Sequence, residues 1–217
     1  MPNIKTAWQY REEGEPVKAI ALWMNDLANY ISQEDCTKVI DTLVDLHIAW
    51  KNLGKQTGEK IYLETSLSCL NQVKEISEKK GFKLRSDWHY YMGGIQLALE
   101  NYGESIKNYE NFLNTAKPRP EIVADVSAHI GYTKSKLGSS EEGVKLLRAS
   151  IEVLKKSVTP NIHQEKDVNA IWLTGALLYL AEIIRDKSIA QEALGLASEK
   201  GLGARATQAK NLLKNLG

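Results

Sequence analysis

Residues 88–113 read WHYYMGGIQLALENYGESIKNYENFL, and residues 128–151 read AHIGYTKSKLGSSEEGVKLLRASI. Each stretch contains a helical segment with a glycine at a close-contact position, a short turn, and a second amphipathic segment. The two glycines, Gly93 and Gly131, are 131 − 93 = 38 positions apart. A period of this length is typical of stacked helical hairpins. The repetition therefore predicts an array of hairpins rather than one compact globule.

The same helical periodicity runs along the rest of the chain, which predicts an all-α protein. The prolines lie where helices would begin or in the connections between them. Pro16 follows Gly14, so one helix is expected to end at the glycine and the next to begin at the proline. Gly54 is expected to end a long helix. A further helix is expected to begin at Thr159 and Pro160.

Several helix starts carry residues that can cap backbone N–H groups. Ser86 and Asp87 precede the helix that carries the first quoted stretch. Serine followed three residues later by glutamate or glutamine is the pattern of a capping box, in which the two side chains satisfy each other's backbone amides. Two such boxes are predicted, one formed by Ser139 with Glu142 and one formed by Ser188 with Gln191.

Composition excludes several classes of function. A formal net charge of +1 over 217 residues provides no global field for nucleic acid or an anionic membrane. The two cysteines, Cys36 and Cys69, lie in apolar helical patterns, which favours buried thiols in a reducing compartment over a disulfide framework. No stretch has the apolar length of a membrane span or the pattern of a signal peptide. A cytoplasmic protein is expected.

The placement of small residues resembles the tetratricopeptide repeat (TPR), in which a small residue of the first helix faces a small residue of the second. The fourth hairpin matches this pattern at Gly131, Gly138, Gly143 and Leu147. The third hairpin matches at Gly93, Ser105, Tyr109 and Phe112, and the first at Ala7, Gly14, Ala19 and Trp23. The second hairpin is longer than the pattern, and the fifth fits it at Gly175, Ala190, Leu194 and Ala197 only with an insertion.

The resemblance implies one right-handed α-solenoid over residues 1–217. Its hairpins are expected at about residues 3–29, 33–80, 86–116, 120–157 and 161–200, followed by a capping helix at about 204–216. It also implies a non-enzymatic interaction module that binds a peptide, a helix or a partner protein in a concave groove lined by the first helix of each hairpin. The groove residues carried over from the family pattern are Trp8, Arg11, Glu12, Trp50, Asp87, Tyr90, Leu97, Asp125, Tyr132, Lys136, Trp172 and Tyr179.

Residue patterns for catalysis or for cofactor binding are weak. The four histidines have no partner at metal-ligand spacing, so no metal site is predicted. The segment from Gly54 to Lys60 has glutamate where a phosphate loop needs lysine, and no strand precedes it. The positions of the family's chaperone-peptide clamp hold Ile4, Trp8, Asp87 and Tyr91, which cannot grip a carboxylate. No enzyme and no cofactor are therefore predicted.

Three alternatives to the interaction module stay open. One is a peptide-sensing regulator whose array tightens around a small peptide. Another is a homo-oligomeric structural subunit, most simply a homodimer formed through Leu212, Leu213 and Leu216 of the C-terminal helix. The third is an RNA-binding solenoid using basic residues near the C-terminus, although lysines on the outer face of a terminal helix are typically solvated charge.

Overall fold

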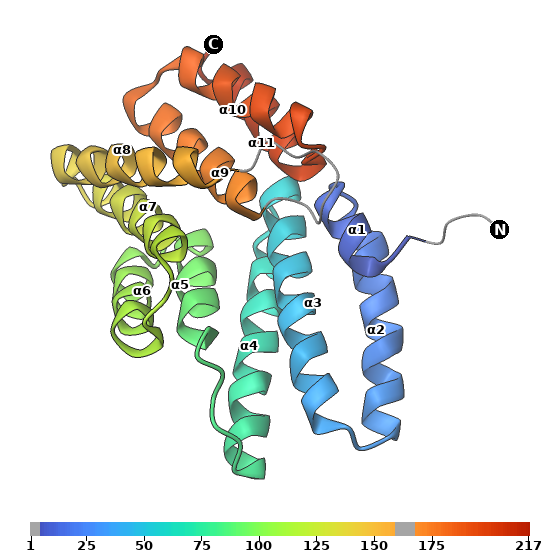
Figure 1. Ribbon diagram of the computed structural model, residues 1–217. Helices are drawn as coiled ribbons and strands as arrows, with labels where there is room; N and C mark the ends of the chain where they lie inside the picture. The colour runs from blue at the N-terminus through green and yellow to red at the C-terminus, as the bar shows by residue number, and fades with distance from the viewer. Residues whose placement is uncertain (1–4, 159–167) are drawn as a thin grey trace. The chain divides into compact units, whose positions relative to one another are not determined.

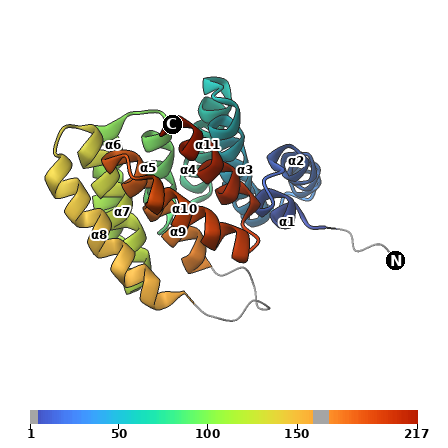
Figure 2. The same cartoon turned by 90° about the horizontal axis from the view of Figure 1, so that it is seen from above.

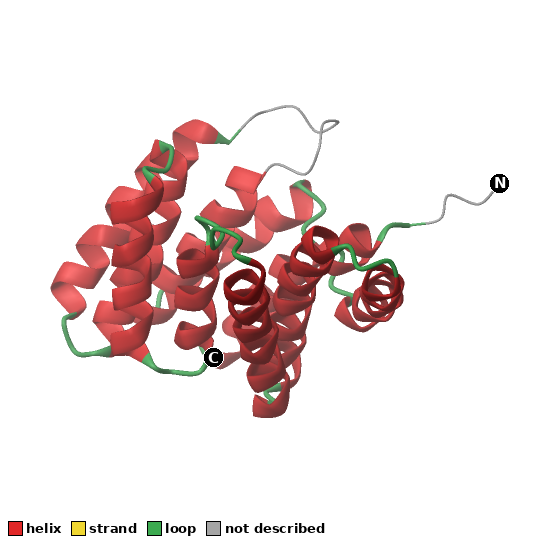
Figure 3. Ribbon diagram, turned by 90° about the horizontal axis from the view of Figure 1, so that it is seen from below, coloured by secondary structure: helices red, strands yellow, loops and turns green. Residues whose placement is uncertain are grey.

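The computed structural model describes residues 5–158 and 168–217, and every regular element in these ranges is an α-helix (Figure 3). The predicted all-α class is confirmed. The expected helix start at Thr159 and Pro160 lies outside the described residues. The chain divides into two compact units, residues 1–101 and residues 102–217, and each unit is described by itself below. The prediction of one continuous array over 1–217 stays a prediction.

The first unit contains five helices in which each helix packs against the next one along the chain (Figure 1). The third and fifth of these helices also touch each other. Its elements are α1 (Ala7–Glu12), α2 (Pro16–Ser32), α3 (Cys36–Thr57), α4 (Lys60–Lys80) and α5 (Trp88–Ala98). Ala7 and Ala19, the predicted small residues of the first hairpin, are both buried in the core of this unit. Gly14 has φ +88° in the turn between them, and Pro16 is the first residue of α2, as predicted.

The second unit contains the remaining six described helices, again packed in chain order (Figure 2). They are α6 (Tyr102–Ala116), α7 (Pro120–Lys136), α8 (Ser140–Ser157), α9 (Val168–Ile184), α10 (Lys187–Glu199) and α11 (Gly203–Asn215). Contacts also join α7 with α9 and α9 with α11, so that alternate helices lie side by side. Because α9 touches four other helices, it is apolar around most of its circumference.

The fourth hairpin, α7 with α8, has the close contact that its glycines predict. A Cβ atom on Gly131 would lie 2.7 Å from the carbonyl oxygen of Gly143. A Cβ atom on Gly143 would overlap the carbonyl oxygen of Gly131 and Oγ of Ser135. Gly138 has φ +97° in the connecting turn. The paired small residues therefore allow the two helix backbones to approach directly. The corresponding pair of the third hairpin, Gly93 and Ser105, is divided between the two units, and its contact stays a prediction.

The prediction that Gly54 ends a helix is wrong. The helix α3 continues to Thr57, and its C-cap is Gly58, whose φ of +77° suits only glycine well. Gly54 is instead buried inside the helix, where a Cβ atom would lie 2.6 Å from Cδ2 of Leu63 on α4. Gly54 therefore allows α3 and α4 to pack closely, whereas Gly58 caps α3. Which glycine has which role depends on the face of α3 that meets α4.

The predicted capping hydrogen bonds are wrong at three helix starts, although two of the N-cap positions are correct. Asp87 is the N-cap residue of α5 and Ser139 that of α8, but neither side chain accepts a capping hydrogen bond. The helix α10 begins earlier than predicted, because the Asp186 carboxylate accepts hydrogen bonds from the backbone N–H groups of Ser188 and Ile189. The Asp186 carboxylate therefore caps α10 in place of the predicted capping box at Ser188.

Candidate functional site

The predicted site residues of the second unit lie on two helices that pack against each other, α7 and α9. Tyr132 and Lys136 stand one turn apart on α7, and both reach Glu182 of α9. The Tyr132 hydroxyl donates a hydrogen bond of 2.9 Å to Oε1 of Glu182, and the Lys136 ammonium lies 2.5 Å from the same oxygen. The ring of Tyr132 stacks on that of Tyr179, with their centroids 4.2 Å apart. Because α11 also packs against α9, we call the surface formed by these side chains and the adjoining side of α11 the α7–α9–α11 face.

Glu182 was not predicted as a site residue, although the sequence contains a pattern that points to it. It follows Trp172, Gly175 and Tyr179 at spacings of three, four and three residues, which places all four on one stripe of α9. A carboxylate at the end of an aromatic stripe is a natural partner for the two α7 side chains. Sequence alone does not say which helix faces that stripe.

Deeper in the same face, a second set of rings surrounds His129 of α7. The imidazole stacks on Tyr109 of α6 at 5.1 Å between centroids, and its Nδ1 lies 3.1 Å from the Tyr179 hydroxyl. Its Nε2 lies 3.7 Å from the Asp125 carboxylate, a predicted site residue that is buried. Burial raises the pKa values of Tyr109 and Tyr179, so both hydroxyls stay protonated and act in hydrogen bonds. This part of the face is a packed polar network.

The side chains of the face differ in their exposure to solvent. Lys136 is exposed and can reach a partner. Burial raises the pKa of Tyr132, and Glu182 adds to the rise. The hydrogen bond to Glu182 also holds the ring of Tyr132 in place. Trp172 is partly buried and packs against the core of the second unit. The rim of the face therefore offers charge and ring edges, while its floor is already satisfied by internal contacts.

The predicted residues of the first unit form separate small groups. Arg11 is buried, lies 2.9 Å from the Glu12 carboxylate and 3.6 Å from that of Asp45, and stands over the rings of Trp8 and Trp23. Burial raises the pKa of Asp45 against the opposing effect of Arg11. Trp8 is 38% exposed. This group joins α1, α2 and α3, so it has a clear structural role.

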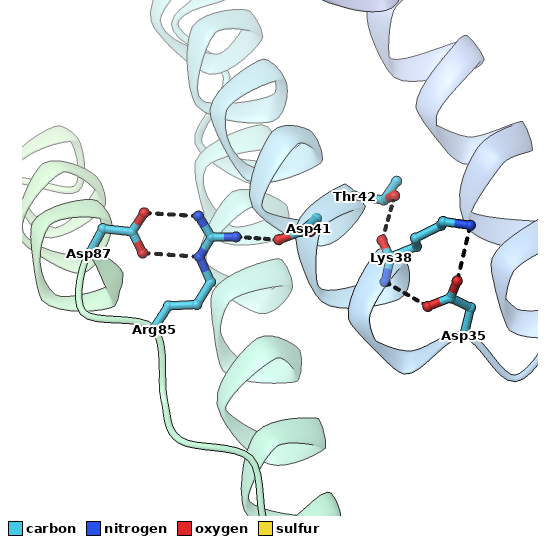
Figure 4. A network of polar contacts seen from close by, with 6 residues as sticks. All are labelled: Asp35, Lys38, Asp41, Thr42, Arg85 and Asp87. Atoms are coloured by element: carbon cyan, nitrogen blue, oxygen red, sulfur yellow. Dashed lines mark hydrogen bonds and ion pairs between the residues drawn. The ribbon is translucent and has the colours of Figure 1, made fainter.

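Asp87 belongs to a charged triad that links α3 with the start of α5 (Figure 4). The Arg85 guanidinium donates two hydrogen bonds to Asp87, at 3.0 and 2.9 Å, and a third to Asp41. The hydrogen bonds to Asp87 raise the pKa of Arg85 further above its usual range. A bidentate pair of this kind fixes orientation as well as distance.

The remaining predicted residues of the first unit are held by packing. Trp50 stacks on Tyr62 with ring centroids 5.7 Å apart, Tyr90 meets Tyr91 edge to face at 5.5 Å, and Leu97 is buried. Tyr62 and Tyr91 were not predicted. Burial raises the pKa of Tyr91 to about 12. Within this unit the structure does not gather Trp50, Asp87 and Tyr90 into one group by any described contact.

The described ranges hold no cluster of three histidine, cysteine or carboxylate side chains suited to a metal ion. No helix of the described part of the chain has both the length and the apolar character needed to cross a membrane. Burial raises the pKa of the Cys69 thiol to about 11, so it is a packing residue and not a reactive thiolate.

Comparison with known proteins identifies the class of fold. No family model matches the chain, and no curated protein matches it. The fold is TPR-like: an all-α arrangement of helical hairpins. Two solved structures of a putative kinesin light chain from Podosopora anserina with nearly identical TPR-like repeats, one of them a point variant, are similar to it. For each, the TM-score is 0.52 at 18% identity, and the match covers 94% of this chain and 92% of the other.

Proposed function

We propose that this protein is a non-enzymatic interaction module that binds a peptide or helical segment of a partner protein across the α7–α9–α11 face. The observation that carries the proposal is the gathering of Tyr132, Lys136, Tyr179 and Glu182 from two adjacent helices. Rigid aromatic rings provide contact area at a small entropic cost, and a charge at the rim orients the ligand. Because the floor of the face is held by internal hydrogen bonds, it is preorganised, which reduces the cost of binding.

The test uses peptides selected from a random displayed library on the full chain. Synthetic versions of the enriched peptides should bind the wild type, and Lys136→Ala should weaken them by about tenfold, equivalent to about 1.4 kcal/mol. Lys145→Ala is the matched control, because Lys145 is an exposed lysine on α8 of the same unit. Thermal melts of both variants establish that the fold is intact. Equal loss of affinity in both variants, or in neither, would show that the peptides bind elsewhere.

A second candidate function, self-association, is favoured by an exposed apolar stripe on α2. The stripe consists of Val17, Ala21, Met24, Ala28 and Ile31, which alternate at spacings of four and three residues as in a coiled-coil seam. The three large residues are 62, 48 and 58% exposed. The order large, small, large, small, large reads the same in both directions, so a second copy running antiparallel presents a complementary surface.

The stripe lies on a single helix of 17 residues, so the area it can bury is smaller than the roughly 800 Å² per partner of a standard interface. We therefore expect weak dimers at high micromolar concentration, measured by sedimentation equilibrium. Met24→Lys should abolish them, whereas Asn25→Lys, which adds the same charge one residue away from the stripe, should not. If Leu213→Lys alone abolishes them, the dimer forms through the leucines of α11 instead. A strictly monomeric chain would exclude both arrangements.

A further inference from the structure

Arg205, in the first turn of α11, occupies space that a glycine of α9 leaves open. A Cβ atom on Gly175 would lie 3.2 Å from Nη2 of Arg205 and 3.4 Å from its Cζ. The guanidinium thus rests against the backbone of α9, in the middle of the α7–α9–α11 face. An alanine at position 175 would require the guanidinium to shift by a few tenths of an ångström. Gly175 fits the TPR pattern as a small packing residue, but what it accommodates is a positive charge.

The hydrogen-bonding capacity of this guanidinium is mostly unused. Its Nη1 donates a 2.8 Å hydrogen bond to Oε1 of Gln208, one turn along the same helix. Within residues 5–158 and 168–217, no carboxylate forms an ion pair with it. The acids of the face have other partners, because Glu182 lies against Lys136 and Tyr132 and Asp125 faces His129. A guanidinium has five N–H donors in a planar fork, so most of them remain for another acceptor.

The surroundings of Arg205 make unbonded N–H donors energetically unfavourable, which favours the binding of an acceptor. The side chain is partly buried, so water solvates it incompletely. Burial raises the pKa of Tyr179, and the nearby positive charge of Arg205 partly opposes this rise. Trp172 stands one turn before Gly175 on the same stripe of α9. An incoming anion would meet a fork of donors beside aromatic surface, in a region where hydrogen bonds to charged groups are strong.

We propose that Arg205, seated against Gly175, is the anchor for a carboxylate of an acidic peptide that binds the α7–α9–α11 face. This inference rests on the proposed function and adds the chemistry of the ligand. The fork of the guanidinium matches the two oxygens of an aspartate, a glutamate or a terminal carboxylate. The ion pair of Lys136 with Glu182 then marks another part of the same surface.

The test uses the same displayed library on the full chain, followed by fluorescence anisotropy with the best synthetic peptide. Selected peptides should be enriched in aspartate and glutamate. Arg205→Gln should weaken binding at least tenfold, and replacing the critical glutamate of the peptide by glutamine should weaken binding to the wild type by a similar factor. The two changes together should cost no more than either alone, because they remove the same contact. Amidation of the peptide C-terminus distinguishes a terminal carboxylate from a side chain.

Further variants separate anchoring from stability. Gly175→Ala keeps every charge but displaces the guanidinium, so it should also weaken binding, and Arg205→Lys should restore only part of the affinity. Lys210→Gln removes an exposed charge from the same helix and should have little effect. If peptides bind but the effects of Arg205→Gln and the glutamate change are additive, the anchor is refuted while the proposed function stands. If the library yields no binder at all, the proposed function fails and this inference fails with it.

Discussion

Substituting alanine for Gly143 tests the basis of the fold most directly. The Cβ atom that alanine adds would overlap Oγ of Ser135 and the Gly131 carbonyl oxygen and would crowd the Ser135 amide nitrogen, and the last two are backbone atoms. Backbone atoms cannot rotate away as a side chain can. The substitution should therefore force α7 and α8 apart and uncover core residues such as Leu147 and Leu154, which are fully buried.

The expected magnitude follows from two opposing effects. Forcing an extra methyl group into a packed contact costs about 1–3 kcal/mol, and more when the backbone must move. Alanine at a helical position is worth about 1 kcal/mol relative to glycine. We expect a net loss of about 2 kcal/mol for Gly143→Ala, which lowers the melting temperature of the second unit by roughly 8 °C for a unit of this size.

The matched control is Gly195→Ala in α10 of the same unit, because a Cβ atom there meets nothing within 4 Å. That variant should gain about 0.5–1 kcal/mol from helix propensity alone. Thermal and urea unfolding followed by circular dichroism measure both effects, and hydrogen exchange localises the loss to α7 and α8. If Gly143→Ala were as stable as Gly195→Ala, direct backbone contact would not be what joins this hairpin.

Three further predictions concern polar groups. The pKa of His47 lies well below its usual value of 6.5 because burial penalises the imidazolium, with a smaller contribution from nearby Lys51. Below pH 6.5 the unfolded chain therefore gains a proton that the folded chain does not, and stability should fall by up to about 1.4 kcal/mol per pH unit; urea unfolding of wild type and His47→Leu between pH 7.5 and 5 should show this slope only in the wild type. Tyr132→Phe removes the hydrogen bond to Glu182 but keeps the stacked ring, so it should cost about 1 kcal/mol in urea unfolding, and an unchanged midpoint would mean that water replaces the bond. Arg85→Gln breaks a triad whose side chains are 32–55% exposed, so the loss should be under about 1 kcal/mol and should shrink in 1 M salt, whereas a salt-independent loss would indicate packing instead of charge.

Much of the local structure was predictable because its causes lie within a few residues of each other. Pro16 begins α2, Gly138 adopts a left-handed turn, and the helical periodicity predicts an all-α chain. Each of these follows from steric limits on one residue or from the spacing of apolar residues along one helix. The cap at Asp186 belongs to this local kind too, and it was missed because the serine pattern two residues later matched a capping box.

The face-to-face glycines were also predictable, since the TPR-like pattern relates Gly131 to Gly143 through a short turn. Gly54 shows where such reasoning fails. Its role depends on Leu63, which approaches from the next helix, and a glycine near the end of a helical pattern looks the same whether it caps or packs. The neighbouring Gly58 is the one with the left-handed backbone.

The sequence by itself determined the helices, their turns and the fold class, because these depend on near neighbours and on periodicity. Only the tertiary structure decided the partners on the α7–α9–α11 face. Lys136 meets Glu182 across 46 positions, and Arg205 meets Gly175 across 30 positions. Which stripe of one helix faces another depends on how the helices rotate and slide as their cores pack, and many alternative pairings share the same sequence pattern.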